Sequence, residues 1–385
     1  MECWKKLRKL GQGSFGTVFQ ACKDSSSFSS SSIMAAVKSA ECTLRNPITS
    51  LKEEAKFLDK LNGTPNVVQC FGEDISIEDN GKVVHNLLLE LALGSLYDMI
   101  KITKKCGKPM TETYVACYAS MLLKGLVAIH SKGIVHCDLK PGNILLFPVH
   151  GTELGILKIA DFGRARWVWE EEEEQVADGT SYSRTTLNYA SPESVSYGLH
   201  GTCTDIWSFG CIVAEMLTGK RVWDSRDEEE LIHMILYDGF YRPHGLSDNG
   251  ADFLSKCLDR DPAQRWLASD LLKHPFIIDN LKIISETPGY DMSILDRNSS
   301  TQKNPFGECG WVSTRHLFSK WMVEALQKQE RDRKRQKRRE LRFQPYTAQQ
   351  SRQAFQFLVE QHQGITLCNT FLVREPKHGS NFHQV

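Results

Sequence analysis

The stretch that most constrains the fold of this chain is residues 134–146, which read Ile-Val-His-Cys-Asp-Leu-Lys-Pro-Gly-Asn-Ile-Leu-Leu. Two short apolar, β-prone runs enclose Asp138, Lys140 and Asn143, so a loop should display these side chains at one rigid point. An aspartate can accept a proton from a hydroxyl, a lysine can neutralise a phosphate, and an asparagine oxygen can help to hold a divalent cation. Such a loop alone is more often a solvated turn. The chemical interpretation therefore depends on the motifs that flank it.

A glycine-rich segment lies near the N-terminus. Gly11, Gly13 and Gly16 form a Gly-x-Gly-x-x-Gly pattern, which is followed at once by a β-prone run and not by a helix. A dinucleotide-binding fingerprint needs a strand, a turn and then a helix, so this pattern does not fit it. A glycine flap between two strands can instead cover nucleotide phosphates with its backbone amides. A plain hairpin is an alternative that the pattern alone leaves open.

The next motif is a strand lysine with a candidate carboxylate partner. Residues 35–38 predict a short strand that ends in Lys38. A single strand lysine is usually exposed at a sheet edge, so a functional interpretation requires a partner. The helix predicted for residues 50–61 carries leucines on one face, and Glu54 should lie beside that face. Glu53 is the alternative partner.

The chain from residue 83 onward alternates between predicted strands, helices and polar loops. Strands are predicted at residues 83–91 and 156–160, and helices at 111–132, 205–217, 228–237, 248–258 and 267–273, with residues 274–277 closing the compact region. The 205–217 segment is apolar nearly all round, which indicates a central buried helix, and Asp205 at its start is interpreted as an N-cap. Asp161, Phe162 and Gly163 follow the 156–160 strand. Asp161 is a candidate metal ligand there, although an isolated Asp-x-Gly is more often a turn.

Length and composition exclude several classes of protein. The 385 residues allow two domains, or one bilobal domain with an extension. The formal net charge is zero, so composition indicates no nucleic-acid or membrane partner. The twelve cysteines include no Cys-x-x-Cys pair, which argues against structural zinc or a disulfide framework and favours a reduced, intracellular compartment. We expect no signal peptide and no apolar run near the roughly 18 residues of a membrane span.

Together these motifs resemble the eukaryotic protein kinase domain over about residues 4–277. The motifs that match in family order are the glycine loop, Lys38, the 134–146 loop, Asp161-Phe162-Gly163, Ser191-Pro192-Glu193, Asp205-x-Trp-x-x-Gly210 and Arg265. Each motif is weak alone, but the joint match is highly specific. The resemblance implies an α+β, bilobal, protein kinase-like fold. A small β-rich N-lobe would span about residues 4–91 and a larger helical C-lobe about 95–277, followed by a C-terminal extension at 278–385.

The resemblance also implies where ATP would bind. The nucleotide-binding residues would be Leu10, Gly11, Gln12, Gly13, Ser14, Phe15, Gly16, Thr17 and Val18 of the glycine loop, with Ala36, Lys38, Glu54, Leu89, Glu90, Ala92 and Leu145. Val18 and Ala36 would cover the adenine from above and Leu145 from below. Leu89 would be the gatekeeper, and the backbone from Glu90 to Ala92 would hydrogen-bond the base.

The same resemblance implies how the catalytic and metal-binding roles divide. Lys38 would grip the α- and β-phosphates and would be held by Glu54. Asn143 and Asp161 would bind magnesium (Mg²⁺). Asp138 would orient the attacking hydroxyl and take its proton, and Lys140 would steady the γ-phosphate. Glu193 would pair with Arg265 beneath the substrate platform, a structural role.

The implied function is an ATP- and Mg²⁺-dependent protein serine/threonine kinase. Lys140 and Thr186 carry the likeness to serine/threonine kinases. Within the family the nearest likeness is to plant-type MAP kinase kinase kinases, and residues 84–90 and Cys137 carry it. This likeness predicts a signalling kinase whose protein substrate is another kinase, with a MAP kinase kinase as the candidate. The alternative is a pseudokinase or scaffold without catalysis. Retention of every charged catalytic residue favours the enzyme.

A basic tract marks the C-terminal extension. Residues 328–342 hold nine Lys or Arg and three acidic residues, within a helix predicted for 315–342. Glutamine-rich residues 349–363 predict loose helix or disorder. A basic tract is typical of a nuclear-import or nucleic-acid patch, and a solvated charged helix is an equally good interpretation. Aromatic residues are sparse there, so we predict no specific nucleic-acid partner. We expect a cytoplasmic protein, with nuclear entry through the tract as a second possibility.

A reporter experiment tests nuclear entry. A fluorescent protein fused to residues 328–342 should accumulate in the nucleus if the tract is read as an import signal, because import receptors bind clustered positive charge. The matched control replaces the lysines and arginines of the tract by glutamine. A fusion that stays cytosolic would exclude the nuclear interpretation.

Cys137 departs from the family pattern, which usually has an arginine before the catalytic aspartate. In many kinases that arginine pairs with a phosphate on the activation segment and orders it. Cysteine cannot form this pair. We therefore hypothesise that activity depends little on phosphorylation of this segment. The alternative is that Cys137 is a small buried residue and another basic group binds the phosphate.

The phosphorylation hypothesis predicts the behaviour of an unphosphorylatable variant. The sites to be replaced together by alanine are Thr180, Ser181, Ser183 and Thr185, and the turnover of the purified variant should be nearly unchanged. Turnover is measured as phosphate transfer at saturating ATP. A collapse in rate would reject the hypothesis and favour another basic group.

Overall fold

The structure is a computed structural model that contains both predicted lobes. It describes residues 4–13, 15–23, 33–42, 49–78, 83–107, 109–149, 154–168, 184–240 and 242–286. The sequence interpretations that lie outside these residues concern Ser14, the sites Thr180, Ser181 and Ser183, the side chain of Thr185, and the extension beyond 286.

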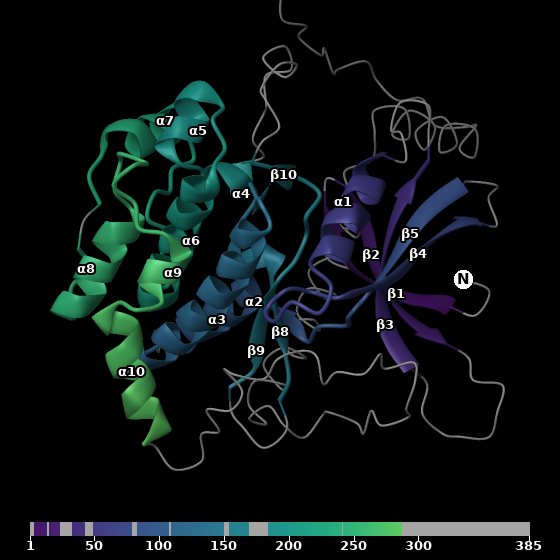
Figure 1. The fold of residues 1–385 in the computed structure, drawn as a ribbon, viewed down its shortest axis with the longest axis horizontal. Coiled ribbons are helices and arrows are strands. Elements are labelled where there is room, and N and C mark those ends of the chain that lie inside the picture. The colour runs from purple at the N-terminus through teal and green to yellow at the C-terminus, as the bar shows by residue number, and fades with distance from the viewer. Residues whose placement is uncertain are drawn as a thin grey trace, which may run out of the picture. The chain divides into compact units, whose positions relative to one another are not determined.

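A five-stranded antiparallel sheet builds the N-lobe, with strand order β1-β2-β3-β5-β4. The strands are β1 (Trp4–Gly13), β2 (Gly16–Lys23), β3 (Ile33–Glu41), β4 (Cys70–Ile77) and β5 (Val83–Leu89). Helix α1 (Thr49–Lys60) lies against the sheet (Figure 1). Its Leu51 and Leu58 are buried in one core with Leu87 of β5, because leucines at helical spacing present one apolar face.

Strand register brings the predicted nucleotide-binding residues of the N-lobe together. Val18 of β2 lies opposite Lys38 of β3, and Ala36 lies opposite Leu89 of β5. Since side chains alternate across a strand, Ala36 and Lys38 share one face of the sheet. That face is the one that α1 covers, so Lys38 can meet a side chain of the helix.

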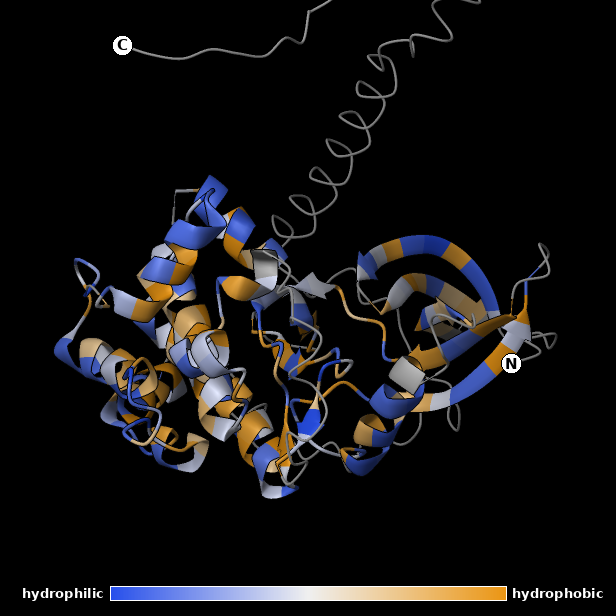
Figure 2. Ribbon diagram, turned by 90° about the horizontal axis from the view of Figure 1, so that it is seen from above, coloured by the Kyte–Doolittle hydropathy of each residue, from blue (hydrophilic) through white to orange (hydrophobic). Residues whose placement is uncertain are grey.

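The C-lobe is helical. Its helices are α2 (Leu96–Lys105), α3 (Glu112–Ser131), α4 (Arg184–Leu187), α5 (Pro192–Tyr197), α6 (Thr202–Thr218), α7 (Glu228–Tyr237), α8 (Asp248–Cys257), α9 (Ala268–Leu271) and α10 (Pro275–Ser285). Helices α3 and α6 contribute more buried apolar side chains than any other helix of the C-lobe. Figure 2 shows apolar and polar residues alternating along the outer helices, as expected of helices that cover a core with one face.

Short strands position the polar loop of the C-lobe. Strand β7 (Ile134–Val135) pairs with β10 (Arg166–Trp167), and β8 (Ile144–Phe147) lies between β6 (Gly94–Ser95) and β9 (Ile156–Ile159). A 3₁₀ turn, Pro141–Asn143, precedes β8. Paired strands on both sides therefore hold the loop from residue 136 to 143, as its two β-prone flanks predicted.

Helix α3 needs comment because of its apolar length. Among the described residues it alone is long and apolar enough to cross a membrane by length and composition, so the expectation of no apolar run near that length is wrong here. About two thirds of its most apolar window, 67%, is buried inside the protein. It contacts α6, α9, α10 and β9, so its apolar surface is explained by packing within the C-lobe.

Two boundaries differ from the sequence-based expectation. Helix α6 begins at Thr202, so its N-cap is Gly201 and Asp205 lies inside the helix. The N-cap interpretation of Asp205 is therefore wrong. Helix α10 continues to Ser285, beyond the predicted end of the compact region at residue 277, because Phe276, Ile277 and Ile284 are buried against the core.

Candidate active site

A buried lysine joins the two lobes. Lys38 Nζ lies 2.5 Å from Glu54 Oε2 of α1 and 2.7 Å from Asp161 Oδ1, at the start of the Asp-Phe-Gly turn. Lys38 and Glu54 are 5% and 1% exposed, whereas Glu53 points to solvent and pairs with Lys56. The Lys38–Glu54 pairing predicted from the helical periodicity is present, and the alternative with Glu53 is wrong.

The charges of this cluster stabilise one another. Burial disfavours the ammonium form of Lys38, but Glu54 and Asp161 outweigh burial and raise its pKa above the ordinary value. Burial likewise disfavours the carboxylate of Asp161, but Lys38 outweighs it and lowers the pKa of Asp161. Both groups are therefore charged at neutral pH. A charged lysine and a charged aspartate at one point suit a ligand that carries phosphates and a cation.

Side chains of the 136–143 loop and of α4 converge on Asp138. Lys140 Nζ donates to Asp138 Oδ2 at 2.7 Å, and Asn143 Nδ2 donates to the same oxygen at 3.0 Å and to the Asp138 carbonyl at 2.8 Å. The hydroxyl of Thr186, from α4, donates to Asp138 Oδ1 at 3.0 Å and accepts from Lys140 at 3.2 Å. A side-chain hydroxyl can therefore reach the carboxylate in the geometry that proton acceptance requires.

Asp205 of α6 holds the start of the 136–143 loop through hydrogen bonds to its backbone. Its carboxylate accepts from the amides of His136, at 2.9 Å, and Cys137, at 3.0 Å. The ring of His130, in the last turn of α3, lies 2.9 Å from the same carboxylate. Burial disfavours the ionised form, but hydrogen bonds and the two histidines lower the pKa of Asp205. This role was missed because no local sequence signal shows that a helix aspartate will face a loop far away in the chain.

The backbone at two positions of the site is left-handed. Cys137 has φ = 62° and Asp161 has φ = 68°, a region that non-glycine residues rarely adopt. The bonds from Asp205 hold the first position, and the ion pair with Lys38 holds the second. Such strain persists only where surrounding contacts determine the conformation, and it is concentrated at functional sites.

The Cys137 side chain is half-buried within the loop. Burial and the nearby Asp205 carboxylate raise its pKa well above the ordinary value, so it is protonated and a poor nucleophile at neutral pH. Arg164 and Arg166 act on this thiol as the nearby positive charges. His200 lines a small pocket with Cys137, but burial lowers its pKa to about 4, which leaves it neutral. The candidate basic groups for an activation-segment phosphate are thus the two arginines.

The predicted adenine site forms a second apolar cluster. Leu89, Ala92 and Leu145 pack against Val68 and Ala160, which are buried. The backbone amide of Glu90 already donates to the Gln69 carbonyl at 3.2 Å. A base can therefore use the carbonyl of Glu90 and the amide of Ala92. No sequence pattern indicated that the Glu90 amide is already bonded.

The side chain of Glu90 has a structural partner that was also missed. Lys158 of β9 donates to both of its carboxylate oxygens, at 2.8 and 2.6 Å. The two residues are 68 positions apart, so no local pattern indicates the pair. This bond connects the segment between the lobes to the strand that leads into Asp161.

The glycine loop closes the site from the N-lobe. Gly11, Gln12 and Gly13 pair with Val18, Thr17 and Gly16 across the β1–β2 hairpin. Gly16 has φ = 145°, and a Cβ there would lie 2.5 Å from the Ser39 carbonyl, so only glycine fits. Gly11, Gly13 and Gly16 bring no side chains of their own to the hairpin, so a phosphate could approach its backbone at these three positions.

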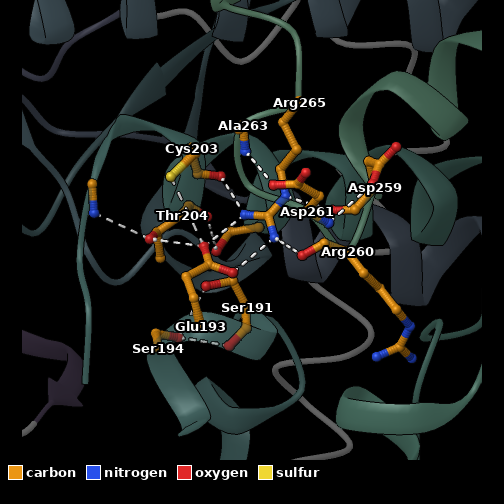
Figure 3. Close-up of polar contacts among 12 residues, drawn as sticks. Ser191, Glu193, Ser194, Cys203, Thr204, Asp259, Arg260, Asp261, Ala263 and Arg265 are labelled. Carbon is orange, nitrogen blue, oxygen red and sulfur yellow. Dashed lines mark hydrogen bonds and ion pairs between the residues drawn. The ribbon is translucent and has the colours of Figure 1, made fainter. Parts of the chain in front are cut away.

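A buried ion pair stabilises the platform beside the site (Figure 3). Arg265 donates from both terminal nitrogens to Glu193, at 2.6 and 2.7 Å, and from Nε to the Asp259 carbonyl at 2.7 Å. Its guanidinium carbon lies 4.9 Å from the ring centroid of Trp207. Burial disfavours the ionised form of Glu193, but Arg265 outweighs it and lowers the pKa of the carboxylate. Glu193 belongs to α5, so the pair fixes this helix, which follows Thr186 in the chain.

Comparisons with known proteins agree with this geometry. Residues 4–277 match the family model described as the protein kinase domain. The chain is 37% identical to Mitogen-activated protein kinase kinase kinase 20 of Arabidopsis thaliana over 285 residues, which cover 72% of this chain and 79% of that protein. It is 38% identical to Mitogen-activated protein kinase kinase kinase 17 of the same plant over 281 residues, covering 71% of this chain and 69% of that protein.

Breaking the platform ion pair should be costly. In Arg265→Met, Glu193 is left as an unpaired buried carboxylate, so the free energy of unfolding at pH 7 should fall by about 3–5 kcal/mol. The control is Arg242→Met, which breaks the exposed pair with Asp248 and should cost less than about 1 kcal/mol. Urea denaturation measures both values.

The pH dependence gives a second readout of the same variant. The pKa of Glu193 is lowered by folding, so its contribution is present above the ordinary value of 4.5 and is lost as the pH falls through the folded-state pKa. The difference between Arg265→Met and the unmodified protein should therefore shrink below about pH 4.5. Equal losses in the two methionine variants at pH 7 would contradict the structural role.

Proposed function

This chain belongs to the protein kinase family, as an ATP-dependent serine/threonine signalling kinase of the plant MAP kinase kinase kinase type, and we propose that its protein substrate is a MAP kinase kinase. One observation carries the proposal for the site. Lys38 contacts both Glu54 and Asp161. A second hydrogen-bonded group in the C-lobe consists of Asp138, Lys140, Asn143 and Thr186. Every charge that phosphoryl transfer requires is thus available at one place.

Lys38 would grip the α- and β-phosphates of ATP. Its position is fixed by Glu54, which reaches it from α1. A shift of α1 would break that bond and displace the ammonium group, so the position of α1 would control activity. The phosphoryl transition state is loose, with charge spread over its oxygens, and catalysis is therefore mainly positioning and electrostatic stabilisation. A fixed, charged lysine supplies both.

Asp138 would orient the attacking hydroxyl and accept its proton. The hydroxyl of Thr186 already donates to this carboxylate, at 3.0 Å, which shows that a hydroxyl fits there. Lys140 lies beside it and would steady the γ-phosphate as charge develops on the transferred group. Asp138 is 5% exposed, so its carboxylate acts in a poorly solvated environment where electrostatic interactions are strong.

Asn143 and Asp161 would hold Mg²⁺. Asn143 turns its amide nitrogen to Asp138, which leaves its carbonyl oxygen for a cation, and Asp161 supplies carboxylate oxygen. Oxygen donors are the ligands that Mg²⁺ prefers. Within the described ranges no group of three or more His, Cys, Asp and Glu forms a metal site. This fits an ion that is completed by nucleotide phosphates and water, where it would neutralise phosphate charge.

The adenine would bind between the lobes. Val18 and Ala36 would cover it from the sheet and Leu145 from the C-lobe, with Leu89 as the gatekeeper. The Glu90 carbonyl and the Ala92 amide would hydrogen-bond the base, because the Glu90 amide is already bonded to Gln69.

The choice of a MAP kinase kinase as substrate rests on the relatives. Both Arabidopsis proteins reported above are named as kinases of a kinase kinase. The alternative of a pseudokinase or scaffold has no support from the site, since Lys38, Asp138, Asn143 and Asp161 are all present and in bonded contact within it.

Radiolabel transfer from ATP tests the proposal. The unmodified chain should phosphorylate a MAP kinase kinase whose own activity has been removed. Lys38→Met and Asp161→Ala should each lower the rate by at least about 100-fold, because each removes a charge that stabilises the transition state. The matched control is Lys56→Met, an exposed lysine of the same lobe, which should keep the full rate.

The outcomes separate the two parts of the proposal. A Lys38→Met protein that keeps the normal rate would refute the site assignment. Transfer to a generic basic protein but to no MAP kinase kinase would leave the kinase in place and remove the proposed substrate.

A further inference from the structure

Phe15, at the tip of the glycine loop, extends into the site. A Cβ built on Gly163 would lie 2.6 Å from Phe15 Cδ2 and 2.9 Å from Cγ, so the ring is in van der Waals contact with the Gly163 backbone. The ring centroid lies 5.9 Å from Lys38 Nζ and 5.9 Å from the guanidinium carbon of Arg164. An N-lobe aromatic ring therefore packs on the Asp-Phe-Gly turn of the C-lobe.

This position coincides with the proposed phosphate site. Lys38 and Asp161 are bonded to each other at 2.7 Å, and Gly163 follows Asp161 by two residues. A triphosphate that reaches these two side chains must lie beneath the glycine loop. An aromatic ring and a triphosphate cannot occupy the same volume. The ring must move before phosphates can contact Lys38 and Asp161 together.

We propose that Phe15 competes with the triphosphate of ATP, and that the arrangement in which its ring packs on Gly163 does not bind the nucleotide. The inference rests on the proposed function, because it requires the ATP phosphates to meet Lys38 and Asp161. The ring is held by contact with Gly163 and by two cations near its face, interactions that are individually weak. It therefore exchanges between positions, and the apparent association constant for ATP is the intrinsic constant multiplied by the fraction of time in which the ring is displaced.

The competing explanation has the opposite sign. If the ring instead covered bound phosphates and excluded water, its removal would weaken ATP binding. The direction of the change in affinity therefore distinguishes the two roles, and adenosine, which lacks phosphates, separates both from a general change in the loop.

Calorimetric titration of the full chain tests the proposal. In Phe15→Ala the dissociation constant for MgATP should fall by about 3- to 10-fold, as expected when a minor competent state becomes dominant. The dissociation constant for adenosine should stay the same, because the ring lies at the phosphate end. Phe15→Leu keeps much of the bulk but loses the aromatic face, so it should give an intermediate MgATP constant. An unchanged melting temperature shows that each variant is folded.

Three results would overturn the proposal. The first is an MgATP constant for Phe15→Ala that is unchanged or raised, which would leave the proposed function intact. The second is an equal shift for adenosine and MgATP, which would point to the loop as a whole. The third is that neither the unmodified chain nor Phe15→Ala binds MgATP although both bind adenosine, which would remove the proposed function together with this inference.

Discussion

The structure depends on one buried charge, the ammonium group of Lys38. A lysine taken out of water is stable only when its charge is compensated, and here Glu54 and Asp161 compensate it. The three residues come from β3, from α1 and from the turn after β9, so no single element can satisfy the lysine. The positions of the helix and of the Asp-Phe-Gly turn are thereby linked. A movement of α1 would therefore also change the surroundings of Asp161.

Buried carboxylates play the same part elsewhere in the C-lobe. Asp205 is 1% exposed and holds the amides of His136 and Cys137. Glu193 is 8% exposed and is bonded to both terminal nitrogens of Arg265. Each carboxylate compensates for its burial by binding a segment without regular structure. Asp205 of α6 thus fixes the loop that holds Asp138, and Glu193 of α5 fixes the segment around Arg265.

The contact between Phe15 and Gly163 adds a constraint that the charges alone do not impose. Gly163 has no side chain, and a Cβ would collide with the ring. A side chain at position 163 would therefore require the Phe15 ring to move. If the ring and the triphosphate compete, the glycine loop both binds the nucleotide through its backbone and limits its entry through its side chain.

Local pattern was sufficient for a large part of this protein. The two β-prone flanks predicted the held loop, the glycine pattern predicted the hairpin, and helical periodicity selected Glu54 over Glu53. These signals work because side-chain direction is set by the period of the element, which is written in neighbouring residues. Shared motif order predicted the protein kinase domain for the same reason, since order along the chain needs no knowledge of contacts.

Tertiary structure alone decided which distant groups meet. Lys38 and Asp161 are 123 positions apart, and Asp205 and His136 are 69 apart. Asp205 was taken for an N-cap because a helix-start aspartate is usually one, and only the packing of α6 beneath the loop shows its carboxylate on two loop amides. The packing of Phe15 on Gly163 and the extension of α10 to Ser285 also depend on contacts between distant parts of the chain. The physical reason is that the free energy of a long-range contact depends on what both partners bury together, and neither partner's neighbours in the sequence carry that information.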